Sequence, residues 1–263
     1  MSWNPHQYLQ YEGERLRPAL DLIARIPLTH PQVIVDLGCG AGNVARMLAD
    51  RFPGATIDGV DGDSAMLDRA RQSLGGDARF RWTQADLATW HAPYAVDLLF
   101  SNAALHWLDD HPRLFPQLFA KLAPHGVLAV QMPDNHAAPS HQALFTTARD
   151  PRWAGEVAAL VRGRPVAELS AYYDLVAPLA KSFDGWRTTY LHILAARADG
   201  EHPVVAWLRG SALTPYTGLL SAPASAAFIA DYAARIELAY PRRPDGTVLF
   251  PFSRIFMVAQ RGA

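Results

Sequence analysis

The chain has 263 residues, half of them apolar and 19% charged, which is typical of a folded globular protein and not of a disordered one. It carries 24 basic and 25 acidic residues, and this net charge of −1 argues against a general nucleic-acid binder, which normally has a basic excess. The single cysteine, Cys39, excludes an internal disulfide and a paired-cysteine zinc site.

The first half of the chain alternates short β-branched segments with longer helical patterns. Strands are predicted over 33–37, 56–60, 79–83, 96–101 and 127–132, and helices over 44–52, after a cap at Ser64, and over 112–122. Strands that alternate with helices indicate an α/β fold, in which a doubly wound, mostly parallel sheet is covered on both faces.

The second half is more helical. We expect helices over 166–179 and 223–240, a sixth strand over 186–194 and a last strand over 255–260. We interpret 1–263 as one domain with a core at about 30–135, helical cap insertions at about 136–183 and 203–240, and an N-terminal lid segment over 1–28. Insertions beyond the carboxyl ends of the strands are well placed to cover a ligand.

A glycine-rich turn follows the first strand and opens a helix. It contains Asp36, Gly38, Gly40 and Gly42. Glycine lets the backbone turn tightly and approach a ligand closely, although a simple tight turn is the alternative. A dinucleotide fingerprint requires G-x-G-x-x-G, whereas here the third glycine comes one position early and Asn43 occupies its place.

Acidic residues end the next two strands. Asp61 could accept hydrogen bonds from both hydroxyls of a ribose, and Asp86 could accept one from an adenine amino group. Met66 could lie on an adenine face, although methionine at helical spacing is more often core. Each acid alone is more often a cap or turn residue, but three at successive strand ends around one glycine turn indicate a nucleoside site.

These residues resemble the motifs of the class I S-adenosylmethionine-dependent methyltransferases. DLGCGAGN matches the first motif, VD at 60–61 the ribose-binding acid and AD at 85–86 the adenine-binding motif, within about the first 135 residues. The resemblance implies S-adenosylmethionine as cofactor, S-adenosylhomocysteine as product, and a seven-stranded sheet whose last strand is antiparallel. The cofactor-binding residues expected from it are Asp36, Gly38, Gly40, Gly42, Asp61, Gly62, Met66, Asp86, Leu87 and Asn102.

The chain also resembles the trans-aconitate 2-methyltransferases nearly end to end. Matching stretches include WNPHQYL at 3–9, SNAALHWLDDHPRLFPQL at 101–118, WRTTY at 186–190 and FPFSRIFMVA at 250–259. This implies methyl transfer to one carboxylate of trans-aconitate, which gives a monomethyl ester. The sequence departs from the family at His106, where members often carry Gln, and over 136–165.

The chemistry of such a reaction can be argued independently. A carboxylate has a pKa near 4, so it is already an ionised nucleophile and requires no general base. The protein must position it, exclude water and compensate the remaining negative charges, which calls for Arg with Tyr or Gln donors. The substrate-binding candidates are Gln7, Tyr8, Trp107, Tyr172, Arg187, Tyr190 and Arg254. His106 is the catalytic candidate, which positions the acceptor and does not act as a base.

Each substrate candidate has a plainer alternative. Arg187 could pair with a surface acid, since 22 of the 24 basic residues are arginines and only two are lysines. Arg254 could be a solvated charge at a strand end, His106 a packed histidine, and only one of Tyr172 and Tyr173 should face a pocket.

Other functions remain open at this point. The substrate could be another carboxylic acid, such as a malonyl thioester on a carrier protein, which predicts a basic surface patch instead of arginines inside a pocket. A nucleic-acid methyltransferase is disfavoured because Ser101-Asn102-Ala103-Ala104 replaces an N-P-P-Y-type motif. A protein that only binds S-adenosylmethionine is a third possibility.

The remaining expectations concern partners and location. The histidines show no metal-ligand spacing, so no metal is expected. No apolar run reaches the roughly 18 residues needed to cross a bilayer, and the N-terminus lacks a signal-peptide core. We expect a cytoplasmic protein that acts on a small polycarboxylate, without a membrane or nucleic-acid partner; the sequence does not define an oligomeric state.

Overall fold

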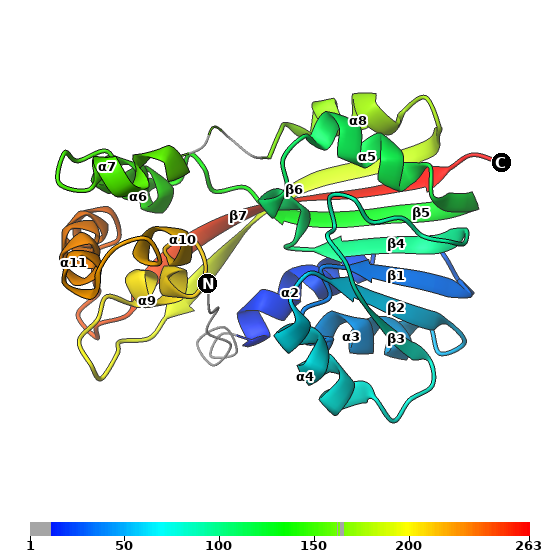
Figure 1. Cartoon of the computed structure of the whole chain (residues 1–263), viewed down its shortest axis with the longest axis horizontal. Helices are drawn as coiled ribbons and strands as arrows, with labels where there is room; N and C mark the ends of the chain where they lie inside the picture. The colour runs from blue at the N-terminus through cyan, green and yellow to red at the C-terminus, as the bar shows by residue number, and fades with distance from the viewer. Residues whose placement is uncertain (1–11, 162, 164–165) are drawn as a thin grey trace. The chain divides into compact units, whose positions relative to one another are not determined.

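The computed structural model describes residues 12–161, 163 and 166–263, which form two compact units (Figure 1). Of the described residues, the sheet unit contains 15–133, 166–188 and 254–263, and the helical unit contains 12–14, 134–161, 163 and 189–253. The sequence predicts one domain with insertions, and the structure groups residues 165–183 of the first predicted insertion with the sheet instead.

The sheet has seven strands in the order β3-β2-β1-β4-β5-β7-β6. Their bounds are β1 Val33–Leu37, β2 Thr56–Asp61, β3 Phe80–Gln84, β4 Val96–Asn102, β5 Leu122–Pro133, β6 Ala180–Leu194 and β7 Val248–Arg261. Strands β1 to β5 pair in parallel, and β7 is antiparallel to β5. This arrangement confirms the predicted doubly wound α/β fold.

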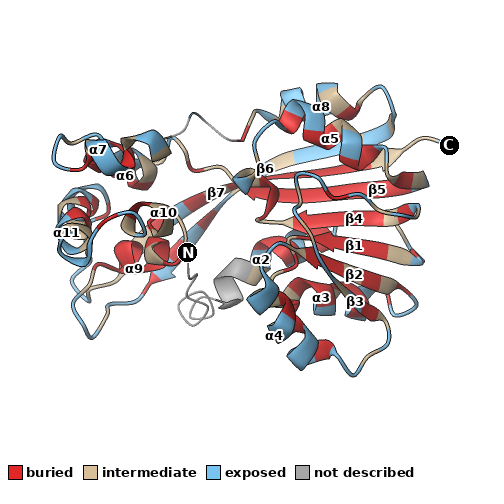
Figure 2. Cartoon of the chain, viewed as in Figure 1, coloured by how far each residue is buried: buried red, intermediate tan, exposed pale blue. Residues whose placement is uncertain are grey.

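Helices cover both faces of the sheet, because the strands at its centre are apolar on both sides (Figure 2). Helices α2 (Glu12–Ile23), α3 (Asn43–Arg51) and α4 (Ser64–Leu74) belong to the first half of the chain, and α5 (His111–Phe119) and α8 (Leu169–Val176) pack on each other. The cap of α4 is Asp63 and not the predicted Ser64: its Oδ1 accepts hydrogen bonds from the backbone N–H of Ala65 at 2.8 Å and of Met66 at 3.3 Å.

The helical unit has its own hydrophobic core. It contains α6 (Pro139–Ala148), α7 (Ala154–Val157), α9 (Pro203–Arg209), α10 (Thr214–Thr217) and α11 (Ala222–Ala239). Trp153, Trp207, Phe228, Tyr232 and Phe250 fill the space between them, and Tyr232 donates a hydrogen bond to the carbonyl of Ser140 at 3.3 Å. No helix in the described ranges is both long and apolar enough to cross a membrane.

The last two strands begin earlier than the sequence predicts. β6 begins at Ala180 instead of residue 186, and β7 begins at Val248 instead of residue 255. The first residues of β6 are largely exposed because β6 is an edge strand, and an edge strand does not need the apolar alternation from which a strand is recognised.

A buried hydrogen-bond chain joins α5 to α8. The two ring nitrogens of His111 lie 2.9 Å from the carbonyl oxygen of Leu105 and 2.7 Å from the hydroxyl of Tyr172. The carbonyl can only accept, so the neutral imidazole carries its proton on Nε2 and accepts the Tyr172 O–H at Nδ1. The backbone N–H of Ala167 donates to the same hydroxyl at 3.1 Å, and the Tyr172 side chain is fully buried.

Tyr172→Phe therefore leaves the ring nitrogen of His111 and the N–H of Ala167 without their partner in the core. We expect the free energy of unfolding to fall by about 1–3 kcal/mol, measured by denaturant titration. Tyr173→Phe is the matched control, since Tyr173 is the next residue and is 50% exposed. Equal effects of the two changes would contradict the assigned hydrogen-bond chain.

Candidate functional site

The glycine turn between β1 and α3 is held against β2. The backbone N–H groups of Gly38 and Cys39 both donate to the carbonyl of Val60, at 2.8 and 3.2 Å. Gly38, Gly40 and Gly42 have φ values of 76°, 54° and 84°, a left-handed region that favours glycine. The sequence pattern thus reflects a real backbone requirement at all three glycine positions.

Gly38 is also required by a close approach of the chain. A Cβ atom placed there would lie 2.1 Å from the Cβ of Ala104, in the turn after β4, and 3.5 Å from the side chain of Leu87, in the turn after β3. The turns after β1, β3 and β4 therefore meet at one point. A Cβ at Gly40 would meet nothing within 4 Å, so the chain leaves open space beside this glycine.

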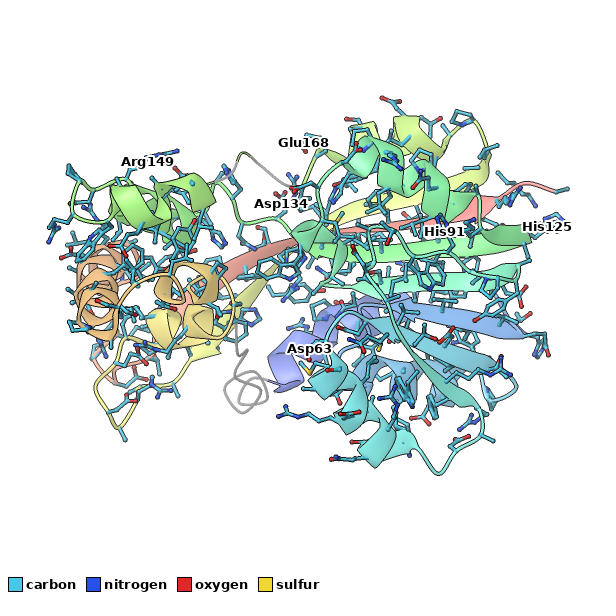
Figure 3. All side chains as sticks on the ribbon, in the orientation of Figure 1. Asp63, His91, His125, Asp134, Arg149 and Glu168 are labelled. Atoms are coloured by element: carbon cyan, nitrogen blue, oxygen red, sulfur yellow. The ribbon has the colours of Figure 1, made fainter. Side chains whose placement is uncertain are left out.

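Asp61 supports the turn from the end of β2. One carboxylate oxygen accepts the N–H of Gly40 at 2.9 Å, and the other accepts the N–H of Asp63, also at 2.9 Å; Asp63 is labelled in Figure 3. A carboxylate offers about four acceptor positions, so these contacts leave capacity for a ligand. Met66, on the first turn of α4, is partly buried.

The sequence leaves two roles open for Asp86, a turn residue or an acceptor for an adenine amino group. It is exposed at the end of β3, and its Oδ1 accepts the N–H of Ala88 at 2.9 Å, as a turn residue does. It also lines a pocket of about 520 Å³ together with Asp58 and Tyr94. There the Tyr94 hydroxyl donates to Asp58 at 2.7 Å, and burial, followed by this carboxylate, raises the pKa of Tyr94 to about 12.

Asp36 is the most perturbed acid of the site. It is 1% exposed, and its Oδ2 has no hydrogen-bond partner among the described residues. Burial, followed by the negative charge of Asp61, raises the pKa of Asp36 to about 7. A positive charge bound nearby would favour the ionised form of this carboxyl.

A row of polar side chains, three of them buried and Asn102 partly buried, crosses the sheet at this end. It consists of Asp36 on β1, Asn102 on β4, Gln131 on β5 and Arg254 on β7, and we call it the polar row. Its members alternate along their strands with residues of the core cluster that contains α5 and α8, so they point to the opposite face. In the sheet Asn102 pairs with Gln131, and Arg254 pairs with Pro133.

The polar row contains buried side-chain atoms that lack a hydrogen-bond partner among the described residues. Arg254 is 5% exposed, and its Nη1 donates to Gln131 Oε1 at 3.3 Å. Asn102 Oδ1 and Gln131 Nε2 are buried without a hydrogen-bond partner in the described part of the chain. Every member of the row except Gln131 is among the candidates predicted from the sequence. In the sequence, Gln131 stands out as a single amide within the otherwise apolar segment 127–132.

Three other substrate candidates make contacts of their own. Arg187 pairs with Glu168 at 3.1 Å, and both side chains are about half exposed (Figure 3). Tyr172 lies in the core, with its hydroxyl bound to His111. Tyr190 belongs to the helical unit, where it is 3% exposed and stacks on His192.

His106 and Trp107 follow β4 in a short 3-10 helix, Leu105–Trp107. Their ring centroids lie 4.8 Å apart; His106 is partly buried and Trp107 is 54% exposed. The candidates Gln7 and Tyr8 lie outside the described residues. Among the described residues, no group of three or more His, Cys, Asp or Glu side chains is arranged to hold a metal ion.

Comparison with known proteins fits this geometry. A family model described as "Methyltransferase domain" matches residues 34–126, which contain the glycine turn and the strand ends around it. The phosphoethanolamine N-methyltransferase 2 of Haemonchus contortus has a related fold, with a TM-score of 0.56 at 17% identity over 94% of this chain and 53% of that one.

Two full-length relatives are much closer in sequence. The trans-aconitate 2-methyltransferase of Variovorax paradoxus is 45% identical over 266 aligned residues, which cover 100% of both chains. That of Paracidovorax citrulli is 46% identical over 99% of both. The aligned stretch spans both units, and identity at this level shows that the chain belongs to the trans-aconitate 2-methyltransferase family.

Proposed function

We propose that the protein transfers a methyl group from S-adenosylmethionine to one carboxylate of trans-aconitate and releases the monomethyl ester and S-adenosylhomocysteine. The observation that carries this proposal, beside membership of the family, is the buried Arg254 in the same row as the acid of the glycine turn. A buried guanidinium is a site for a small anion.

The residues around the glycine turn fit the cofactor. The open space at Gly40 admits a ligand against the backbone, and Asp61 has acceptor capacity for ribose hydroxyls. The other cofactor candidates are Gly62 and Met66, between the end of β2 and the first turn of α4, and Asp86 and Leu87, after β3. When bound, the cofactor supplies a methyl group on a positively charged sulfonium, which an ionised carboxylate accepts without losing a proton.

The chain's own part in the reaction is placement and charge compensation. Arg254 balances the negative charge that a polycarboxylate carries into a buried site, which lowers the cost of removing that charge from water. His106 follows β4 at the same end of the sheet and positions the acceptor carboxylate. It does not act as a base, because the acceptor has no proton to remove.

The burial of Arg254 also favours a free small molecule over an acid carried by a protein. Recognition of a carrier protein requires exposed basic side chains, whereas Arg254 is 5% exposed. Arg187 is exposed and paired with Glu168, as in its plainer alternative. The cytoplasmic location and the absence of nucleic-acid and membrane partners stay predictions from the sequence.

A side-by-side transfer assay tests the proposed substrate. With radiolabelled cofactor, we expect trans-aconitate to be methylated faster than cis-aconitate, isocitrate or isopropylmalate, and the product to be a monomethyl ester by mass spectrometry. Cofactor binding without methylation of any of these acids would favour a different substrate or a protein that only binds the cofactor.

Asp61→Ala should weaken cofactor binding at least tenfold, because it removes both the ribose acceptor and the support of Gly40. Isothermal titration with S-adenosylhomocysteine measures this loss. Asp58→Ala is the matched control, since Asp58 lies on the same strand and binds Tyr94 and Thr83 instead. Similar losses in both variants would count against the role of Asp61.

The raised pKa of Asp36 predicts a pH dependence of cofactor binding. S-adenosylmethionine has a net positive charge, so it binds more tightly when Asp36 is ionised. With a pKa of about 7 the ionised fraction rises from about a tenth at pH 6 to about nine tenths at pH 8, and affinity should rise by up to about tenfold.

Titrations of S-adenosylmethionine at these two pH values test this. Asp36→Asn should abolish most of the rise because the amide does not ionise. A rise of the same size in the variant would assign the effect to another group.

A further inference from the structure

We propose that Gln131 is a specificity-determining residue of the substrate site, which orients Arg254 and itself donates a hydrogen bond to the bound carboxylate. This inference rests on the proposed function, since it concerns the anion that Arg254 binds. Neither the sequence motifs nor the cofactor-binding turns assign any role to Gln131.

The chemistry of arginine fixes the orientation of the Gln131 amide. A guanidinium only donates hydrogen bonds, so the amide oxygen must face Arg254, as the 3.3 Å contact from Nη1 to Oε1 shows. The NH2 group then points away from the guanidinium. Flipping the amide would place two donors against each other, which excludes the reverse assignment.

The NH2 group of Gln131 is therefore a buried donor in a defined direction. The side chain is 0% exposed, and Nε2 has no hydrogen-bond partner among the described residues. A buried donor without a hydrogen-bond partner lowers the stability of the folded protein, because its desolvation is not compensated. In native structures a bound ligand or water molecule is one explanation for such a group. Asn102 Oδ1, at the paired position on β4, is likewise buried and without a partner in the described chain.

Gln131 is a neutral amide, so its own contact with Arg254 does not cancel the charge of the guanidinium. A glutamate would form an ion pair with the guanidinium and cancel the attraction for an anion, whereas glutamine holds it through a dipole. A carboxylate has two oxygens, so it can accept from the guanidinium with one and from the Gln131 NH2 group with the other.

The backbone of Gln131 also contacts the turn after β4, which lies next to the glycine turn. Its carbonyl accepts the N–H of Ala103 at 3.0 Å, and Ala103 has a φ of 54°, rare for a residue other than glycine. The next residue, Ala104, is the one that approaches Gly38 so closely. The Gln131 strand end therefore supports the turn that meets the glycine turn.

Gln131→Glu separates a binding role from a structural one. The carboxylate should pair with Arg254, so the melting temperature should equal or exceed that of the wild type. At the same time it should repel trans-aconitate, so affinity measured by isothermal titration with S-adenosylhomocysteine bound should fall more than tenfold. The affinity for S-adenosylhomocysteine should stay within about twofold of the wild-type value, because the substitution changes the contacts of the substrate carboxylate and not those of the cofactor.

Gln260→Glu is the matched control. Gln260 pairs with Val127 at the other end of the same two strands, and its Nε2 donates to the carbonyl of His125 at 3.0 Å (Figure 3). The same change of charge there should leave the affinity for trans-aconitate unaltered. Gln131→Leu is a second variant, which should raise the KM for trans-aconitate about tenfold with kcat within about threefold.

The possible results are distinct. Wild-type affinity for trans-aconitate in Gln131→Glu and an unchanged KM in Gln131→Leu would overturn the inference and leave the proposed function intact. A parallel loss of melting temperature and of both affinities would also overturn it, since it would assign Gln131 a structural role only. A wild-type protein that binds S-adenosylhomocysteine but no polycarboxylate would overturn the inference together with the proposed function.

Discussion

The close approach of Ala104 to Gly38 is the contact on which the site depends. Only a residue without a side chain allows the turn after β4 to lie against the turn after β1, since a Cβ would come within 2.1 Å of Ala104. Leu87 reaches the same point from the turn after β3. The ends of three strands are thus brought together, and Asp61, Asp86 and the polar row lie at this end of the sheet.

The positions of individual charged side chains are more informative about ligand binding than the net charge of the chain. The net charge of −1 describes a surface on which arginines and acids pair with each other, as Arg187 does with Glu168. Such exposed pairs contribute little to stability and bind no ligand specifically. Arg254 differs because it is buried, in a place with little water, and donates a hydrogen bond to the neutral amide of Gln131.

The sequence predicts the fold and the backbone of the glycine turn well, because both rest on local signals. Strand and helix alternation defines the doubly wound sheet, and glycines at positive φ define the turn. The direction in which a side chain points, by contrast, depends on contacts with residues far away in the sequence. Tyr172 and Arg254 look alike as candidates, yet His111 holds one in the core while Gln131 orients the other in the polar row.

The parts that the sequence misses have a common physical cause. Gln131 was missed because one amide in an apolar strand has no motif, and its meaning comes from the strand that β7 places beside it. The early start of β6 was missed because an edge strand needs no apolar alternation. Residues 165–183 group with the sheet because α8 packs on α5, which no local pattern reveals.

The most direct test of the central claim is an experimental structure of the protein with S-adenosylhomocysteine and trans-aconitate bound. The account predicts a substrate carboxylate within hydrogen-bond distance of the Arg254 guanidinium, at the carboxyl ends of β4 and β5. A substrate held by Arg187 and out of reach of Arg254 would contradict it.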